Sequence, residues 1–219
     1  MINQYIRTLK CLFQSPEEVI DSFIETESSI YTHPFKFLLL GAIPFIILSS
    51  IFVDFSSTSV STDPTTADLL SFWVEVSTIR LSTQFLTLTL FLSIPLLSLP
   101  ALFFLRDELE GFYSHLILNS YSIGASMPAL LTLIPFWVFI NIPISDPLLH
   151  STLPAIVIGS IVIITYKKYF KVENIIGWIR ILSSFICGYL IYILLKGLLG
   201  GVIGYMIFAV TRLAELGSM

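Results

Sequence analysis

Charge is what this sequence has least of. Only 12% of its 219 residues are Asp, Glu, Lys or Arg, whereas soluble domains carry about 25%. Hydrophobic residues make up 55%, and the mean hydropathy is +0.90. Because so few charged side chains cannot cover a water-facing surface, an ordinary soluble protein is excluded. The net charge of −4 also argues against nucleic-acid binding, which requires a basic face. We therefore expect the lipid bilayer to be the main partner.

Cysteines and catalytic motifs are scarce as well. Cys11 and Cys187 are the two cysteines, and neither has the CxxC or Cys/His spacing of a metal site. We therefore predict no metal and no cofactor, and we predict no disulfide because the two cysteines lie in regions assigned to different depths of the membrane. The sequence contains no HExxH, GxGxxG or P-loop motif, and Gly124-Ala-Ser126-Met-Pro lacks the second glycine of a GxSxG elbow. With no complete catalytic set, we expect no enzyme and assign no catalytic residue.

The sequence is instead dominated by long apolar runs. Five of them approach or exceed the ~20 residues that cross a ~30 Å hydrocarbon core as a helix. Because lipid offers the backbone no hydrogen-bond partner, runs of this length are expected to be helical. We predict an all-α fold, a polytopic transmembrane helical bundle of about five spans over residues 34–213. The spans are expected near residues 36–53, 85–105, 116–140, 149–166 and 183–211.

The two ends of the sequence differ from this bundle. Residues 1–33 are predicted to form amphipathic helices, because apolar residues from Ile2 to Phe13 recur at helical spacing and Ser15-Pro16-Glu17-Glu18 carries helix-start signals. This leader is expected in the cytoplasm, on the bilayer surface or against the bundle; a helical layer without membrane contact is the alternative. No cleavable signal peptide opens the sequence, so the first span is expected to serve as its own insertion signal. Residues 214–219 are a tail that resembles a linker scar.

Between the first two spans, residues 54–84 begin rich in Ser and Thr and become apolar from Leu69. We expect a loop and then a helix from about Thr66, running on toward the second span. Prolines within the spans are expected to bend their helices, since each removes one backbone hydrogen bond. They are Pro44, Pro95, Pro100, Pro128, Pro135 and Pro154.

The positions of the cations predict an orientation in the bacterial inner membrane. With the N-terminus in the cytoplasm, eight cations fall on the cytoplasmic side, whereas Arg80 and Arg212 fall outside, as the positive-inside rule requires. The eight are Arg7, Lys10, Lys36, Arg106, Lys167, Lys168, Lys171 and Arg180. An odd number of spans then places the C-terminus outside.

The last apolar segment leaves two structures open. Residues 181–211 would form ~46 Å of helix, too long for one upright span, while two halves joined at Lys196 would each be too short. We favour an interfacial helix over residues 175–182 followed by one tilted span, and a broken pair is the alternative.

Lys196 is the one charge in the interior of a predicted span. A lysine at mid-span costs about 2.5–3.5 kcal/mol on insertion scales, so such residues are functional candidates by default. It is a candidate for transport or for binding a lipid headgroup. The alternative is a lysine that extends its ammonium group to the interface.

A second polar cluster follows the turn at residues 106–111. On one helix Glu108, His115 and Asn119 would share a stripe at i, i+7 and i+11. A histidine with carboxylates can shuttle protons or bind zinc, although this set is smaller than a zinc site needs. The alternatives are solvated turn charges and an interhelical hydrogen bond from Asn119.

Two overlapping GxxxG pairs lie next to Lys196. They are Gly197 with Gly201, and Gly200 with Gly204. Without Cβ atoms two helix backbones can approach closely, so the motif predicts a tight helix–helix contact in a membrane. The partner is either another span of this chain or a second copy of it.

Short motifs resemble a family of bacterial membrane proteins of unknown function. Its members typically carry a zinc ribbon ahead of a T-L-x-x-L…P…Y…P-F segment, similar to Thr8-Leu9-Lys-Cys-Leu12-Phe-Gln-Ser-Pro16 and Tyr31-Thr-His-Pro34-Phe35. Pro100-Ala-Leu-Phe-Phe-Leu-Arg106 and Tyr113-Ser-His115 also resemble its second and third spans. No CxxC precedes Thr8, so a role of that ribbon does not carry over. The five-span layout with a cytoplasmic N-terminus is more distantly similar to the Yip family of membrane-trafficking proteins. Neither resemblance implies catalytic residues.

Together these features predict a non-enzymatic scaffold or accessory subunit of a membrane assembly. Its partner would be a second copy or another membrane protein. The alternative is a small transporter or channel for an ion, lipid or small solute, based on Lys196, Asn119 and the proline-bent spans.

Overall fold

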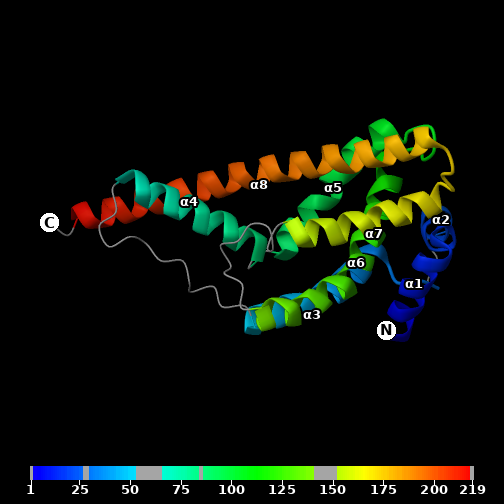
Figure 1. Ribbon diagram of the computed structural model, residues 1–219, viewed down its shortest axis with the longest axis horizontal. Helices are drawn as coiled ribbons and strands as arrows, with labels where there is room; N and C mark the ends of the chain where they lie inside the picture. The colour runs from blue at the N-terminus through cyan, green and yellow to red at the C-terminus, as the bar shows by residue number, and fades with distance from the viewer. Residues whose placement is uncertain (1, 27–29, 53–65, 84–85, 141–151, 218–219) are drawn as a thin grey trace.

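The computed structural model describes residues 2–26, 30–52, 66–83, 86–140 and 152–217 (Figure 1). These residues form eight α-helices, which confirms the prediction of an all-α helical bundle. The helices are α1 (Ile2–Gln14), α2 (Pro16–Thr26), α3 (Pro34–Phe52), α4 (Thr66–Thr83), α5 (Leu86–Phe104), α6 (Phe112–Ile140), α7 (Leu153–Tyr169) and α8 (Ile175–Gly217). The loop expected before Thr66, the join between α4 and α5, and residues 141–151 lie outside the described part.

The leader forms the expected pair of helices. Helix α2 starts at Pro16, where proline suits the first helical position because that N–H would have no partner. Its residues Val19 and Ile20 are fully buried, and α2 packs against α6 and α7. The leader therefore closes one end of the bundle.

That end carries the charged turns of the described residues, and we call it the charged end. Arg180 at the start of α8 contacts Asp107 in the α5–α6 turn at 3.4 Å. The Tyr169 hydroxyl at the end of α7 donates to Asp21 of α2 at 2.7 Å. Helices α3, α6 and α8 therefore start at the charged end, whereas α5 and α7 finish there (Figure 1).

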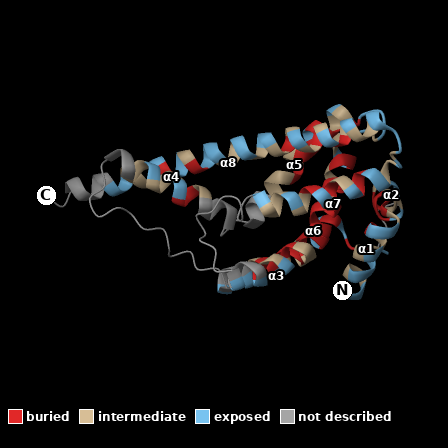
Figure 2. Ribbon diagram, in the orientation of Figure 1, coloured by how far each residue is buried: buried red, intermediate tan, exposed pale blue. Residues whose placement is uncertain are grey.

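The core lies where α3 and α6 pack closely in parallel. A Cβ at Gly124 of α6 would lie 2.6 Å from the Phe37 ring, and one at Gly41 of α3 would lie 2.7 Å from the Met127 side chain. Glycine at these two positions thus allows the helices to approach. Buried residues are concentrated in α6, whereas much of α8 is exposed (Figure 2).

Helix α8 is longer than the sequence suggested. It runs without interruption for 43 residues, or ~65 Å, so the last apolar segment is not a broken pair. Residues 175–182, expected as an interfacial helix that leads into the span, form the first part of α8 itself, with no break after Leu182. Helices α5 and α4 pack antiparallel along α8: Gly188 faces Leu97 of α5, and Gly204 faces Val74 of α4.

By length and composition alone, two helical segments in the described residues are long and apolar enough to cross a membrane. Phe112–Pro135 in α6 is mostly buried in the protein, whereas little of Ile175–Thr211 in α8 is buried. The apolar stretches in α3, α4 and α5 are shorter. They are Pro34–Leu48, Leu69–Thr78 and Phe91–Phe104.

The prolines fall into two groups. Five of the six lie inside α3, α5 and α6, as expected. Pro154 instead lies in the first turn of α7, where no i−4 carbonyl of the helix is lost, so its predicted bend is wrong.

Candidate functional site

A buried hydrogen-bond network centred on Asn119 joins three helices. The Asn119 amide nitrogen donates to Ser98 Oγ of α5 at 2.9 Å and to the His115 carbonyl oxygen at 3.0 Å. Its side-chain oxygen accepts a bond from the Tyr166 hydroxyl of α7 at 2.8 Å. Asn119 and Ser98 are fully buried, and Tyr166 is nearly so. The hydrogen bonds of the Asn119 side chain therefore join α5, α6 and α7.

His115 lies one turn before Asn119 and is also fully buried. Its Nε2 lies 3.0 Å from the Leu109 carbonyl oxygen. Because a carbonyl only accepts, Nε2 carries the proton and Nδ1 is left as an acceptor. Nδ1 has no hydrogen-bond partner among the described residues. The ring thus ties the start of α6 to the preceding turn.

Glu108 does not join this cluster. It is exposed in the turn between α5 and α6, and α6 begins only at Phe112. Gly111 has a φ of +85°, a left-handed conformation that separates the turn from the helix. The predicted single stripe of Glu108, His115 and Asn119 is therefore wrong for Glu108. Across the described residues no group of three or more His, Cys, Asp or Glu side chains is placed to hold a metal.

A second buried polar network, which the sequence did not reveal, holds the segment that leads into α3. The Thr32 backbone N–H donates to Thr8 Oγ1 of α1 at 2.9 Å, and the Thr32 carbonyl oxygen accepts from the Tyr121 hydroxyl of α6 at 2.8 Å. Thr8 and Thr32 are both buried. Both threonines lie in the motifs that carry the family resemblance, but nothing in the sequence predicts a contact between residues 24 positions apart. Nearby, burial raises the pKa of the Tyr5 phenol above its ordinary value, so this ring stays neutral.

Lys196 is half-buried near the middle of α8. It precedes Gly200 by one turn and Gly204 by two, which places the three residues on one side of the helix. That side faces α4, since Gly200 lies against Thr78 and Gly204 against Val74. Lys196 therefore lies where α8 packs on α4, whereas the network around Asn119 joins α5, α6 and α7.

The two GxxxG pairs have different surroundings. A Cβ at Gly204 would lie 2.6 Å from Val74 Cα, so Gly200 and Gly204 are used for close contact with α4. A Cβ at Gly197 or Gly201 would meet no atom within 4 Å. These two glycines line a shallow apolar groove of about 580 Å³ with Ile193, Leu194, Leu198 and Val202. One pair is thus internal, and the other faces outward.

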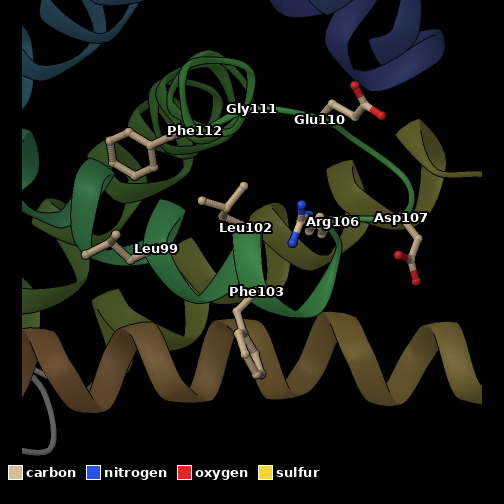
Figure 3. Close-up of a pocket in the computed structure, with 8 residues that line it drawn as sticks. All are labelled: Leu99, Leu102, Phe103, Arg106, Asp107, Glu110, Gly111 and Phe112. Atoms are coloured by element: carbon tan, nitrogen blue, oxygen red, sulfur yellow. The ribbon is translucent and has the colours of Figure 1, made fainter.

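A pocket of about 880 Å³ opens at the charged end, beside the α5–α6 turn (Figure 3). Its apolar side is formed by Leu99, Leu102, Phe103 and Phe112. Arg106, Asp107 and Glu110 form its charged rim. The pocket therefore combines an apolar wall with charges of both signs.

Polar contacts at the charged end join the leader helices α1 and α2 to α7 and to Lys171 just after it. Besides the bond from Tyr169 to Asp21, the Lys168 ammonium group donates to the Phe13 carbonyl oxygen, and Lys171 lies 3.9 Å from Glu17. The leader is thus attached to α7 by polar contacts as well as by buried apolar residues.

Tyr169→Phe tests this attachment. We expect the change to remove one hydrogen bond to a carboxylate and to cost about 1 kcal/mol, so that the leader opens more often. Hydrogen exchange of the α2 amides should become several-fold faster. Tyr113→Phe is the matched control, because Tyr113 is 57% exposed and has no hydrogen bond to another described residue. Equal exchange rates in the two variants would show that the bond does not hold the leader.

Comparison of the chain with protein-family models, curated proteins and solved structures finds no match.

Proposed function

We propose that this protein is an integral protein of the bacterial inner membrane and acts as a non-enzymatic scaffold or accessory subunit. In this proposal α3, α5, α6, α7 and α8 are the five spans, with the N-terminus in the cytoplasm and the C-terminus outside. Its partner is a second copy of the chain, bound at the outward face of α8. The observation that carries the proposal is the exposed apolar surface of α8.

That surface supports a membrane location. Large apolar side chains are exposed along much of α8, including Leu190, Leu194, Leu198, Val202 and Met206. Soluble monomers rarely expose contiguous apolar patches of more than a few hundred Å². Hydrocarbon or a partner helix would cover these side chains without the cost they incur in water.

The direction of the helices supports the topology. The five proposed spans alternate in direction from the charged end, and all eight cations assigned to the cytoplasm lie in α1, in the first turn of α3, in the turns of that end or beside them. Helices α3 and α5 have 19 residues each, and α7 has 17. At 1.5 Å per residue these are ~26–28 Å, and a bilayer adapts to a mismatch of a few Å at modest cost.

The polar core supports a structural role. Both donors and the acceptor of the Asn119 amide are occupied by protein groups. A transport site needs polar groups that can exchange partners with a solute, whereas these groups bond one helix to another. For this reason the scaffold is preferred over the transporter.

The outward glycine pair supports self-association. Gly197 and Gly201 leave a groove with nothing from the described residues above them. Small residues of this kind let a second helix approach closely where packing rather than the hydrophobic effect drives association. The same groove on a second copy would provide an equivalent surface, as a twofold dimer requires.

The test combines membrane extraction with measurement of the oligomeric state. We expect the protein to remain in membranes after alkaline carbonate washing and to be dimeric by native mass spectrometry in a mild detergent. The double variant Gly197→Leu/Gly201→Leu should be monomeric, because leucine side chains would fill the groove. Met206→Phe is the control: Met206 is exposed and, nine residues from Gly197, lies on the opposite side of the helix.

Three results would contradict the proposal. Release by carbonate would remove the membrane location. A wild-type monomer, or a dimer that persists in the double variant, would remove the self-association. Flux of a solute through proteoliposomes that depends on Lys196 would favour the transporter instead.

A further inference from the structure

The pocket beside the α5–α6 turn has the form of a ligand site. Its volume of about 880 Å³ is within the ~300–1,000 Å³ typical of ligand pockets. In Figure 3, Leu102 and Arg106 lie between the start of α6 and the first half of α8, with Leu99 and Phe112 on one side of them. The carboxylates of Asp107 and Glu110 lie on the other side. The apolar and charged parts of the pocket are therefore separated.

The charges on the rim are not all equivalent. The Asp107 carboxylate is 3.4 Å from the Arg180 guanidinium, so this acid already has a cation. Arg106 forms no ion pair with another described residue, and neither does Glu110. One cation and one anion, both exposed, thus remain free to bind a ligand that carries a negative and a positive group.

The apolar wall requires a ligand with a hydrocarbon part. Phe103 is 81% exposed and Leu99 is 53% exposed, although both belong to a helix that packs on α6 and α8. A small polar metabolite would not cover these side chains. An acyl chain lying along α5 would cover them and would continue directly from a headgroup at the rim.

We propose that this pocket binds one phospholipid whose headgroup carries both a phosphate and a primary ammonium group, of the phosphatidylethanolamine class. The phosphate is bound by Arg106, whose planar guanidinium matches phosphate oxygens. The ammonium group is bound by Glu110, and an acyl chain follows Phe103 and Leu99. The inference rests on the membrane location proposed above, which places the charged end at the depth of the cytoplasmic headgroups.

The test is native mass spectrometry of protein purified into mild detergent and mixed with equal amounts of phosphatidylethanolamine and phosphatidylglycerol. We expect the wild type to retain the zwitterionic lipid preferentially. Arg106→Gln should reduce retention of both lipids by about fivefold, as expected for loss of one cation next to a phosphate. Glu110→Gln should leave total retention similar but lower the ratio of phosphatidylethanolamine to phosphatidylglycerol about threefold.

Two controls carry the same charge changes away from the pocket. Lys10→Gln and Glu173→Gln remove an exposed cation and an exposed anion at the charged end, and both should bind lipid like the wild type. Retention in Arg106→Gln that equals retention in Lys10→Gln would overturn the site. An unchanged lipid ratio in Glu110→Gln would overturn the assignment of the ammonium group.

The test of the lipid site can fail independently of the test of the proposed function. Release of the wild type by carbonate would disprove the membrane location first. A protein that stays in the membrane and forms dimers, but retains lipid independently of Arg106, would disprove this inference alone. Because Arg106 is exposed and outside the buried core, its variant should fold, and thermal unfolding of Arg106→Gln at the wild-type temperature would verify this.

Discussion

Gly204→Ala is expected to force α4 away from α8 and to destabilise the protein. The added Cβ would lie 2.6 Å from Val74 Cα and 2.7 Å from Val74 N. These are backbone atoms, so no side-chain rotation relieves the overlap, and α4 itself must move. Overpacking of this kind costs about 1–3 kcal/mol. We expect a lower midpoint of unfolding in mild detergent and faster hydrogen exchange along α4.

Gly201→Ala is the matched control, because it makes the same chemical change in the same helix. A Cβ at Gly201 meets no atom within 4 Å, and alanine favours a helix interior over glycine by about 0.5–1 kcal/mol. The two variants should therefore change stability in opposite directions when both are measured at dilutions where the chain is monomeric. Equal destabilisation would indicate that α4 does not pack on Gly204.

Gly204 and Gly201 also show how much of this helix packing could be predicted from the sequence. The spacing of a GxxxG motif predicts a close helix contact, and Gly204 makes one. The spacing cannot say which helix approaches, because Gly200 and Gly201 differ by only one residue and face directions 100° apart. The partner, α4, begins in a stretch rich in Ser and Thr and includes Glu75. Nothing in that composition predicts that it covers Gly204.

Helix boundaries could be predicted where the sequence carries a local signal, such as a proline or a charged turn. Helix α2 starts at Pro16, and the charged turn before α6 separates it from α5. The length of α8 was not predictable in this way, since the run from Ile175 contains no proline and its four glycines from Gly197 to Gly204 lie inside a continuous helix. The thickness of a bilayer suggested an interfacial segment over residues 175–182 that leads into one tilted span, whereas α8 runs as one helix from Ile175 to Gly217. Glycines within α8 are compatible with the helix because α4 and α5 pack against it.

Only the part of the candidate site that lies on α6 could be predicted from the sequence. His115 and Asn119 are one turn apart in α6, so their proximity follows from the helical period. Their partners come from other helices: Ser98 lies 21 residues before Asn119, and Tyr166 lies 47 residues after it. Ser98 is a polar residue in an apolar run, which suggests a buried hydrogen bond without identifying its partner. Tyr166 lies between Thr165 and Lys167 at the end of an apolar run, where nothing in the sequence predicts that its hydroxyl is buried. Glu108 was misplaced because a helical stripe was extended across Gly111.

The second large effect is expected from a substitution of Asn119, whose side chain is buried and hydrogen-bonded to α5 and α7. Asn119→Ala should destabilise the protein by about 2–4 kcal/mol, because it leaves the Tyr166 hydroxyl and Ser98 Oγ each without one hydrogen bond in a buried position. Ser122→Ala is the control, since the Ser122 hydroxyl bonds only within its own helix, to the Leu118 carbonyl oxygen at 2.7 Å. That variant should change stability by less than about 1 kcal/mol. Reversible unfolding in mixed micelles measures both.

A double-mutant cycle with Tyr166→Phe isolates the bond between α6 and α7. If the Tyr166 hydroxyl donates to Asn119 in the folded protein, its removal should cost about 0.6–1.7 kcal/mol in the wild type and much less in the Asn119→Ala background. The difference is the coupling energy of the pair. Costs that add in the double variant would mean that the two side chains do not interact. The network around Asn119 would then have no role in holding α7 to α6, and the buried apolar contacts would have to do so alone.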